Sequence, residues 1–351
     1  MTGDGASAQD GENAEKYTSS DEENAVMKAL VLEQNENKTL AEVKEVDLPA
    51  LGEGDVRVDI DWSSLNYKDA LAITGKGKII RQFPMVPGID FCGRVSESRD
   101  ARFTPGQAVI LTGWGVGENH WGGLAEQACV KGDWLVALPE SLRARNAMII
   151  GTAGFTAMLC VMALQDAGIK PQDGTVLVTG ASGGVGSTAV VLLKALGYTV
   201  AAVTGRESTH DFLRKLGADE ILPRSDFEQT RPLEKQLWAG AIDTVGNHVL
   251  AKVLAQTNYG GCVAACGLAG GFELPTTVMP FILRNVRLQG VDSVMVPTAQ
   301  RGAVWENLAR TLPESYYQQA ATEITLEQAP ATAADFLNNK IQGRTLVKIS
   351  G

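Results

Sequence analysis

The feature that most constrains the fold is a glycine-rich turn at residues 179–186, which reads Thr-Gly-Ala-Ser-Gly-Gly-Val-Gly. It lies between an apolar run at 175–179 and a helical stretch, 185–196, that ends at Gly197. Glycines at such a junction let the backbone approach a pyrophosphate, and the free amides of the helix N-terminus attract the anion. The turn therefore predicts a dinucleotide site in a Rossmann sheet. The contacts expected from it are Ser182, Gly183, Gly184 and Val185.

Two other kinds of protein that contain such a turn are excluded by particular residues. A P-loop needs Lys before Ser187, where Gly186 stands. The short-chain dehydrogenase fold shares the glycine pattern, but keeps it near its N-terminus and adds a Tyr-x-x-x-Lys pair. No tyrosine of this chain has Lys four residues later.

The pattern of apolar residues changes near residue 147, which predicts two domains. Up to that point, short alternating runs separated by Gly and Pro predict antiparallel strands at 27–32, 56–60, 107–111 and 134–138. After it, apolar strands alternate with helical stretches, as in a parallel α/β sheet. Strands of that sheet are expected at 175–179, 199–203, 220–222, 241–245, 261–266 and 288–293.

Two further helices, near 305–312 and 331–339, precede a final strand at 344–349. We expect that strand to return to the β-rich first domain. The fold class is therefore α/β. A doubly wound Rossmann sheet occupies residues 148–294, and a β-rich catalytic domain occupies residues 27–147 and 295–351.

Charge and cysteine content exclude several classes of protein. Residues 1–26 hold seven acidic residues and one lysine, and so carry −6 of the formal net charge of −10. This polar, aperiodic segment is expected to be disordered, whether native or added to the chain. No basic stripe indicates nucleic-acid binding. Five cysteines without framework spacing indicate a reducing compartment, and no membrane span or signal peptide is expected, so we predict a cytoplasmic protein.

The residues after the second Rossmann strand favour NADPH over NADH. An NAD site places Asp or Glu there for the ribose 2′-hydroxyl. Here Thr204, Gly205 and Arg206 follow the strand, and a hydroxyl with a guanidinium suits a 2′-phosphate. Arg224, after the third strand, is expected to flank the adenine end. The alternative is that both arginines are solvated surface residues.

Several strings of residues resemble one family of enzymes. They lie at 62–71 (Trp-Ser-Ser-Leu-Asn-Tyr-Lys-Asp-Ala-Leu), 87–90, 113–122, 151–156 and 341–344. Together with the order of the domains, they resemble the medium-chain dehydrogenase/reductases. Within that group they resemble the NADPH-dependent acryloyl-CoA reductases, which are relatives of the zinc-free quinone oxidoreductases. The resemblance covers residues 27–349 and implies that the β-rich domain is GroES-like.

The resemblance also implies further cofactor contacts and a partner. The cofactor contacts it adds are Tyr67, Leu268, Ile282, Ser293, Asn339 and Arg344. Members of the family often dimerise by pairing their sixth Rossmann strands, so residues 288–293 are the expected homodimer interface.

No metal is expected. Zinc-dependent relatives hold the catalytic ion with Cys, a Gly-His-Glu motif and a further Cys, where this chain has Asn66, Gly-Ile-Asp at 88–90, and no thiol in 151–156. The three histidines, His120, His210 and His248, are interpreted as local hydrogen-bonding residues.

Hydride transfer without a metal needs an acceptor that is already electrophilic, such as a 2-enoyl thioester or a quinone. The resemblance implies hydride transfer to the β-carbon of acryloyl-CoA, after which the enolate oxygen needs donors and the α-carbon needs a proton. The candidate catalytic residues are Asn66, Tyr67, Asp69 and Asp90. Each has a structural alternative: packing for Tyr67, capping for Asn66 and Asp69, and an ion pair with Arg344 for Asp90.

Three functions remain open at this point. The first is NADPH-dependent reduction of acryloyl-CoA, and the second is NADPH:quinone oxidoreduction. The third is non-enzymatic NADPH binding, which the polar residues at 66, 67, 69 and 90 disfavour.

Overall fold

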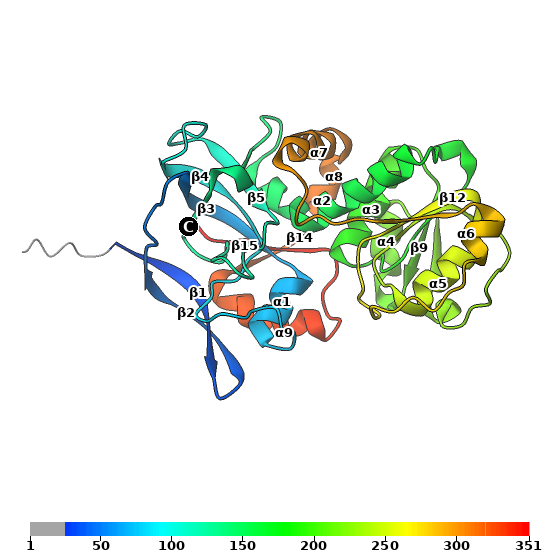
Figure 1. Ribbon diagram of the computed structural model, residues 1–351, viewed down its shortest axis with the longest axis horizontal. Coiled ribbons are helices and arrows are strands. Elements are labelled where there is room, and N and C mark those ends of the chain that lie inside the picture. Colours follow the sequence, from blue (N-terminus) through cyan, green and yellow to red (C-terminus); the bar gives the residue numbers. More distant parts are fainter. Residues whose placement is uncertain (1–24, 320, 351) are drawn as a thin grey trace, which may run out of the picture.

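Two lobes form the molecule, as Figure 1 shows for the computed structural model. The structure describes residues 25–319 and 321–350. The acidic segment 1–26, for which disorder is expected, lies almost entirely outside the described residues. The lobe on the left of Figure 1 is called the β-rich lobe, and the one on the right the Rossmann lobe.

The Rossmann lobe is built on one parallel sheet of six strands in the order β10-β9-β8-β11-β12-β13. Counted along the chain from β8, this is the strand order of a dinucleotide-binding sheet, and it confirms the predicted fold class. The strands are β8 (Val176–Val178), β9 (Val200–Thr204), β10 (Glu220–Pro223), β11 (Trp238–Asp243), β12 (Thr257–Ala265) and β13 (Arg287–Gly290).

Helices cover both faces of this sheet, which explains why its strands are apolar without alternation. Val176 and Val178 face the core formed with α2 (Ala144–Asp166) and α3, while Leu177 between them faces the core formed with α5. The helices of the Rossmann lobe are α3 (Gly184–Ala195), α4 (His210–Leu216), α5 (Asn247–Gln256) and α6 (Met279–Arg284).

The β-rich lobe contains a seven-stranded sheet in the order β14-β15-β3-β4-β5-β7, with β6 also pairing with β3. The last strand, β15, runs antiparallel to β3, so the C-terminus returns to the first lobe as expected. The strands of this sheet are β3 (Asp55–Leu65), β4 (Asp90–Ser98), β5 (Ala108–Thr112), β6 (Gln127–Lys131), β7 (Val136–Ala137), β14 (Ala321–Thr325) and β15 (Arg344–Lys348).

A separate hairpin and four helices complete this part of the chain. The hairpin pairs β1 (Val26–Asn35) with β2 (Lys38–Asp47). The helices are α1 (Tyr67–Thr74), α7 (Thr298–Thr311), α8 (Glu314–Gln319) and α9 (Ala329–Leu337). In the two lobes together, short 3₁₀ turns lie at Gly132–Trp134, Pro171–Asp173, Glu207–Thr209, Arg224–Phe227 and Leu326–Gln328.

A long helix, α2 (Ala144–Asp166), connects the lobes (Figure 1). It is long and apolar enough to cross a membrane, but 78% of its most apolar part is buried inside the protein. It packs against α3 of one lobe and against α7, β3 and β4 of the other. It is therefore a core helix, and it bends at Gly151, where φ is +52°.

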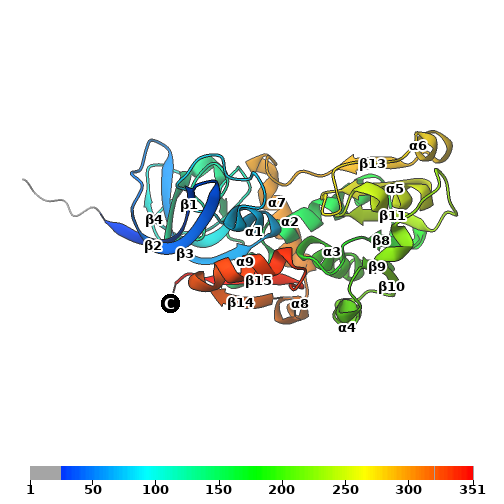
Figure 2. The same ribbon diagram turned by 90° about the horizontal axis from the view of Figure 1, so that it is seen from below.

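The chain passes between the lobes a second time after β13. Figure 2 shows this strand leading from the end of the Rossmann lobe back towards α7. We call residues 291–297 the crossing segment.

Candidate active site

The four candidate catalytic residues lie at two adjacent strand ends in the β-rich lobe. Asn66 is the N-cap of α1, directly after β3, and Asp90 is the first residue of β4, which pairs with β3. Asn66, Asp69 and Asp90 are buried, whereas Tyr67 is 52% exposed. The structure therefore brings Asn66, Asp69 and Asp90 together and leaves Tyr67 facing outward.

Asp90 is held by donors from two segments, residues 64–66 and Thr152. Its Oδ2 accepts hydrogen bonds from Ser64 Oγ at 2.8 Å, Asn66 Nδ2 at 2.9 Å and the Thr152 amide at 2.8 Å. Its Oδ1 accepts one from Thr152 Oγ1. A carboxylate that accepts four donors is fixed in place.

Asp69 organises the start of α1. Its carboxylate accepts the Asn66 amide at 2.9 Å, and the Gly88 and Ile89 amides at 3.2 and 3.0 Å. Burial first, and the charge of Asp90 second, raise its pKa to about 6. Asp69 therefore caps the helix, which is its structural alternative from the sequence, and it also holds the turn that leads to Asp90; its catalytic role stays a prediction.

Arg344 lies behind these residues, as the predicted partner of Asp90. Its Nη2 is 3.9 Å from Asp90 Oδ2, its Nη1 donates to Asn66 Oδ1 at 3.1 Å, and its Nε donates to the Ile149 carbonyl at 2.7 Å. A Cβ placed on Gly184 would be 3.2 Å from Arg344 Nη1. Arg344 is only 2% exposed. Through these contacts it connects the buried polar residues to the glycine-rich turn. We call Ser64, Asn66, Asp69, Asp90, Thr152 and Arg344 the buried polar cluster.

The predicted cofactor residues of β8 and β9 also converge. Gly180 has φ +57°, and any Cβ on Gly186 would collide with the Gly180 carbonyl, so the turn requires both glycines. Ser182 Oγ is 3.4 Å from Thr204 Oγ1 and accepts a hydrogen bond of 3.2 Å from Arg206 Nη2.

Arg206 reaches the other lobe as well. Its guanidinium donates to the carbonyls of Asn339 and Ile341, both at 2.7 Å. Arg224 lies beside Gly205, whose Cβ would be 3.6 Å from Arg224 Cδ. The predicted residues 182, 204, 205, 206, 224 and 339 thus surround one end of the sheet. Two of these residues are arginines, whose positive charge is the kind expected of a 2′-phosphate site.

Two other predicted cofactor contacts, Ile282 and Ser293, are not brought to this group. Leu268 is 65% exposed in the loop after β12, where a Cβ on Gly270 would be 2.9 Å from Arg224 Nη2. Ile282 is 73% exposed on α6. This helix lies at the end of the Rossmann lobe remote from the β-rich lobe in both views (Figures 1 and 2). Ser293 lies in the crossing segment, where its carbonyl accepts a hydrogen bond from Arg301. The roles of these three residues rest on the resemblance and stay predictions.

Sequence reasoning missed two residues of the buried polar cluster, Ser64 and Thr152. Both donate to Asp90, and both belong to strings that resemble the family, at 62–71 and 151–156.

The residues of the cluster do not fit a zinc ion. Within 25–319 and 321–350, no three His, Cys, Asp or Glu side chains come close enough to bind a metal. Both oxygens of Asp90 already accept protein donors, and Asn66 Oδ1 accepts Arg344.

Comparison with known proteins assigns the family. Residues 52–140 match the model of the alcohol dehydrogenase GroES-like domain, and residues 184–310 match that of zinc-binding dehydrogenases. The chain is 72% identical to the probable acrylyl-CoA reductase AcuI of Escherichia coli (strain K12), over 92% of this chain and all of that protein. The chain belongs to the medium-chain dehydrogenase/reductase superfamily.

Two more members of the superfamily are similar over the same length. The acrylyl-CoA reductase AcuI of Ruegeria pomeroyi is 52% identical over 92% of this chain and 99% of its own. The crystal structure of the yhdH oxidoreductase from Salmonella enterica in complex with NADP has a TM-score of 0.91 and 74% identity, covering 92% of this chain and 100% of that one. The fold of this medium-chain reductase is therefore that of a relative crystallised in complex with NADP.

Proposed function

We propose that this protein reduces the C=C bond of acryloyl-CoA to give propanoyl-CoA, with NADPH as the reductant. The observation that carries the proposal is the 72% identity with a probable acrylyl-CoA reductase over that protein's whole length. The 74% identical structure in complex with NADP supports the choice of cofactor. Reduction of a quinone by the same cofactor is the second candidate, and the similarity to two acrylyl-CoA reductases makes it the weaker one.

The residues of the glycine-rich turn would hold the pyrophosphate of NADPH, and Thr204, Arg206 and Arg224 its 2′-phosphate. When bound, the cofactor supplies the hydride. Ser182 would contact both the pyrophosphate and the 2′-phosphate, because it belongs to the turn and its hydroxyl lies next to Thr204 and Arg206.

Tyr67 is the residue we assign to the substrate. Transfer of hydride to the β-carbon leaves negative charge on the thioester oxygen, which a hydroxyl donor stabilises, and the α-carbon then takes a proton. Tyr67 has an exposed side chain. Asn66 instead uses both amide N–H groups on Asp90 and Asp69. We therefore give Asn66, Asp69 and Asp90 positioning roles, and assign the donor role to Tyr67 alone.

We also propose that the enzyme works without zinc, in the cytoplasm, as a homodimer. Strand β13 is an edge of the Rossmann sheet, and an edge strand is free to pair with a second copy. Next to it in the chain, Val278, Ile282 and Leu283 of the α6 region are 62%, 73% and 57% exposed. We also propose that the boundaries between the catalytic and Rossmann domains lie near residues 148 and 294.

The test is an assay of NADPH oxidation with acryloyl-CoA, crotonyl-CoA and a small quinone, with and without a strong chelator. We expect acryloyl-CoA to be the best acceptor, propanoyl-CoA to be the product by mass spectrometry, and the chelator to have no effect. A higher specificity constant for the quinone would favour the second candidate. Loss of activity on removal of a stoichiometric zinc ion would refute the metal-free mechanism.

A further inference from the structure

A buried arginine outside the candidate site ties the two lobes together. Arg301, on α7, is 1% exposed. Its Nε donates to the Val296 carbonyl at 2.8 Å, and its Nη2 donates to the carbonyls of Ser293 at 3.2 Å and Val294 at 2.8 Å. Its Nη1 donates to the carbonyl of Thr112 at 2.8 Å and to Thr112 Oγ1 at 3.1 Å. All five N–H groups of the guanidinium are therefore used, and every acceptor is an uncharged oxygen.

The acceptors belong to two segments that matter for the candidate site. Thr112 ends β5 and pairs directly with Asp90 of the buried polar cluster. Residues 293–296 belong to the crossing segment, which continues from β13 of the Rossmann sheet. One side chain thus connects the strand beside Asp90 to the chain that leaves the Rossmann sheet.

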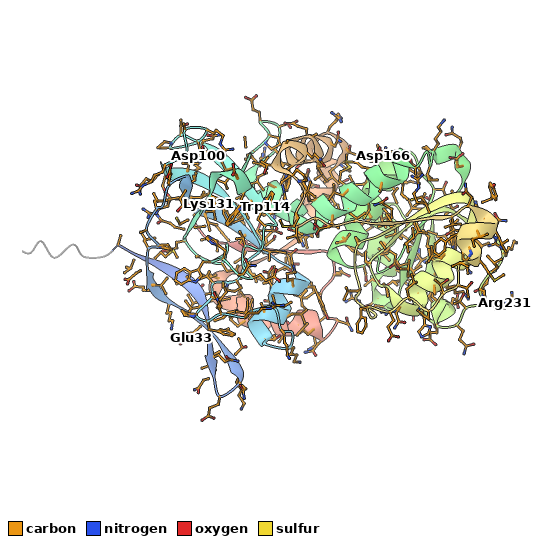
Figure 3. The ribbon with its side chains drawn as sticks, viewed as in Figure 1. Glu33, Asp100, Trp114, Lys131, Asp166 and Arg231 are labelled. Atoms are coloured by element: carbon orange, nitrogen blue, oxygen red, sulfur yellow. The ribbon has the colours of Figure 1, made fainter. Side chains whose placement is uncertain are left out.

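The residues around the Arg301 guanidinium are closely packed. A Cβ on Gly113 would be 2.7 Å from the Val294 carbonyl and 2.9 Å from Arg301 Nη2. The next residue, Trp114, donates its amide to the Val294 carbonyl at 3.0 Å, and its ring lies 4.9 Å from the Arg301 guanidinium. Figure 3 labels Trp114 where the β-rich lobe meets α2 and α7.

A second aromatic ring packs against Arg301, and it belongs to the helix that also donates to Asp90. Phe155 of α2 lies 5.3 Å from the guanidinium, and it is one helical turn after Thr152, which donates to Asp90. Burial lowers the pKa of Arg301 to about 10, so the side chain remains a cation at neutral pH. A buried cation without a carboxylate partner is costly. A planar fork with five donors is the side chain that can collect this many carbonyls at once.

We propose that Arg301 is a positioning residue for hydride transfer, because it fixes the separation between the Rossmann sheet and the strand that carries Asp90. The inference rests on the proposed function only in naming the reaction. All five N–H groups of Arg301 donate to protein oxygens, so the side chain has no donor left for cofactor or substrate, and its replacement should slow the chemical step without removing the glycine-rich turn or Arg206.

The experiment compares Arg301→Lys, Thr112→Val and the control Arg310→Lys, which changes an exposed arginine of the same helix. Lysine keeps the charge but offers three donors, and Thr112→Val removes one acceptor without a change in shape. For Arg301→Lys we expect kcat to fall about tenfold or more, while the Kd of NADPH stays within about twofold, since small misplacements strongly affect rate. Thr112→Val should show a smaller loss, and Arg310→Lys none.

Two readouts separate positioning from loss of stability. The primary deuterium isotope effect on kcat, with NADPH deuterated at the transferred position, should rise in Arg301→Lys as hydride transfer becomes rate-limiting. Amide hydrogen exchange in 112–114 and 292–296 should accelerate in the same variant but not in the control. Activity lost only in proportion to unfolded protein, with an unchanged isotope effect, would overturn the inference. If Arg301→Lys does not fold, an unchanged kcat in Thr112→Val overturns it.

Failure of the proposed function gives a different result. A wild-type enzyme that reduces a quinone but not acryloyl-CoA refutes the proposed substrate. The variants are then ranked with the quinone, where the inference predicts the same order because hydride leaves the same cofactor.

Discussion

At the scale of single residues, the candidate site is defined by which polar groups are already satisfied. Asp90 accepts four donors and Asn66 donates both of its side-chain N–H groups, so Asn66 has no donor left for a substrate. The sequence identified these residues but could not assign their roles, because roles depend on hydrogen bonds between segments far apart in the chain. Tyr67 is the exception, and its exposure distinguishes it.

Replacement of Tyr67 by Phe should therefore separate the two enzymatic functions. We expect turnover of acryloyl-CoA to fall about 100-fold, because an enolate forms next to a missing donor. A quinone is more electrophilic and takes protons from water, so its reduction should fall much less. The check is steady-state kinetics with both acceptors. An unchanged acryloyl-CoA rate would remove Tyr67 from the mechanism.

Arg206→Glu should weaken NADPH binding by about 1.5–3 kcal/mol, the range for hydrogen bonds to charged groups. NADH, which lacks the 2′-phosphate, should lose much less affinity. Isothermal titration with both cofactors measures the difference. Since Arg206 also holds the Asn339 and Ile341 carbonyls, Arg206→Met is the matched control for loss of those bonds without charge reversal. Equal losses for NADPH and NADH would contradict the specificity role.

Asp69 predicts a pH dependence of stability. Its pKa is raised from 3.8 to about 6 in the folded protein, so the folded state binds this proton more tightly than the unfolded state. The favourable contribution is full below about pH 4 and is lost as the pH rises through 6. Relative to Asp69→Asn, the wild-type free energy of unfolding should fall by about 2 kcal/mol between pH 4 and 7. Urea unfolding of both proteins tests this, and parallel pH curves would disprove it.

At the scale of elements, the Rossmann strands and α3 were predictable, while α2 was not. The strands are short apolar runs next to turns, and the glycine-rich turn fixes where α3 begins. Helix α2 is apolar on nearly every face because both lobes bury it, so it lacks the periodicity that marks a surface helix. The predicted sixth strand at 288–293 was placed too late, since β13 is Arg287–Gly290 and the chain then leaves the sheet.

The bend of α2 gives a prediction at this scale. In Gly151→Ala, the new Cβ would lie 2.5 Å from Arg344 Nη2 and 2.6 Å from Asp90 Oδ2, at a φ of +52°. We expect a loss of about 2–3 kcal/mol in the free energy of unfolding, with reduced kcat. Urea unfolding measures it, with Gly302→Ala as the control, because nothing lies within 4 Å of that Cβ. Similar stability of the two variants would show that the bend tolerates a side chain.

At the scale of the whole molecule, the two lobes share one site between them. Arg344 links the glycine-rich turn to Asn66, and Arg206 links it to the loop before β15. Sequence patterns revealed each lobe separately, and the resemblance implied their order. The contacts between lobes involve single side chains from distant segments, which no periodicity records.

The proposed dimer can be tested on the same scale. Ile282→Arg together with Leu283→Arg places two charges on an apolar surface beside β13. If β13 is the interface, sedimentation should show a shift from dimer to monomer. Leu40→Arg, which changes a 49% exposed residue of the β1–β2 hairpin, is the control and should stay dimeric. A wild-type monomer, or a double variant that remains dimeric, would refute this interface.

The position of β15 has a consequence for synthesis on the ribosome. The strand inserts between β14 and β3, so the central sheet of the β-rich lobe requires residues 344–348. The Rossmann strands and helices lie between residues 176 and 290 and are complete much earlier in translation. Strand β3 must therefore wait for the synthesis of residues 344–348 before it gains this neighbour. Until then the nascent chain exposes an unpaired edge at residues 62–65 of β3, the kind of surface that chaperones protect from aggregation.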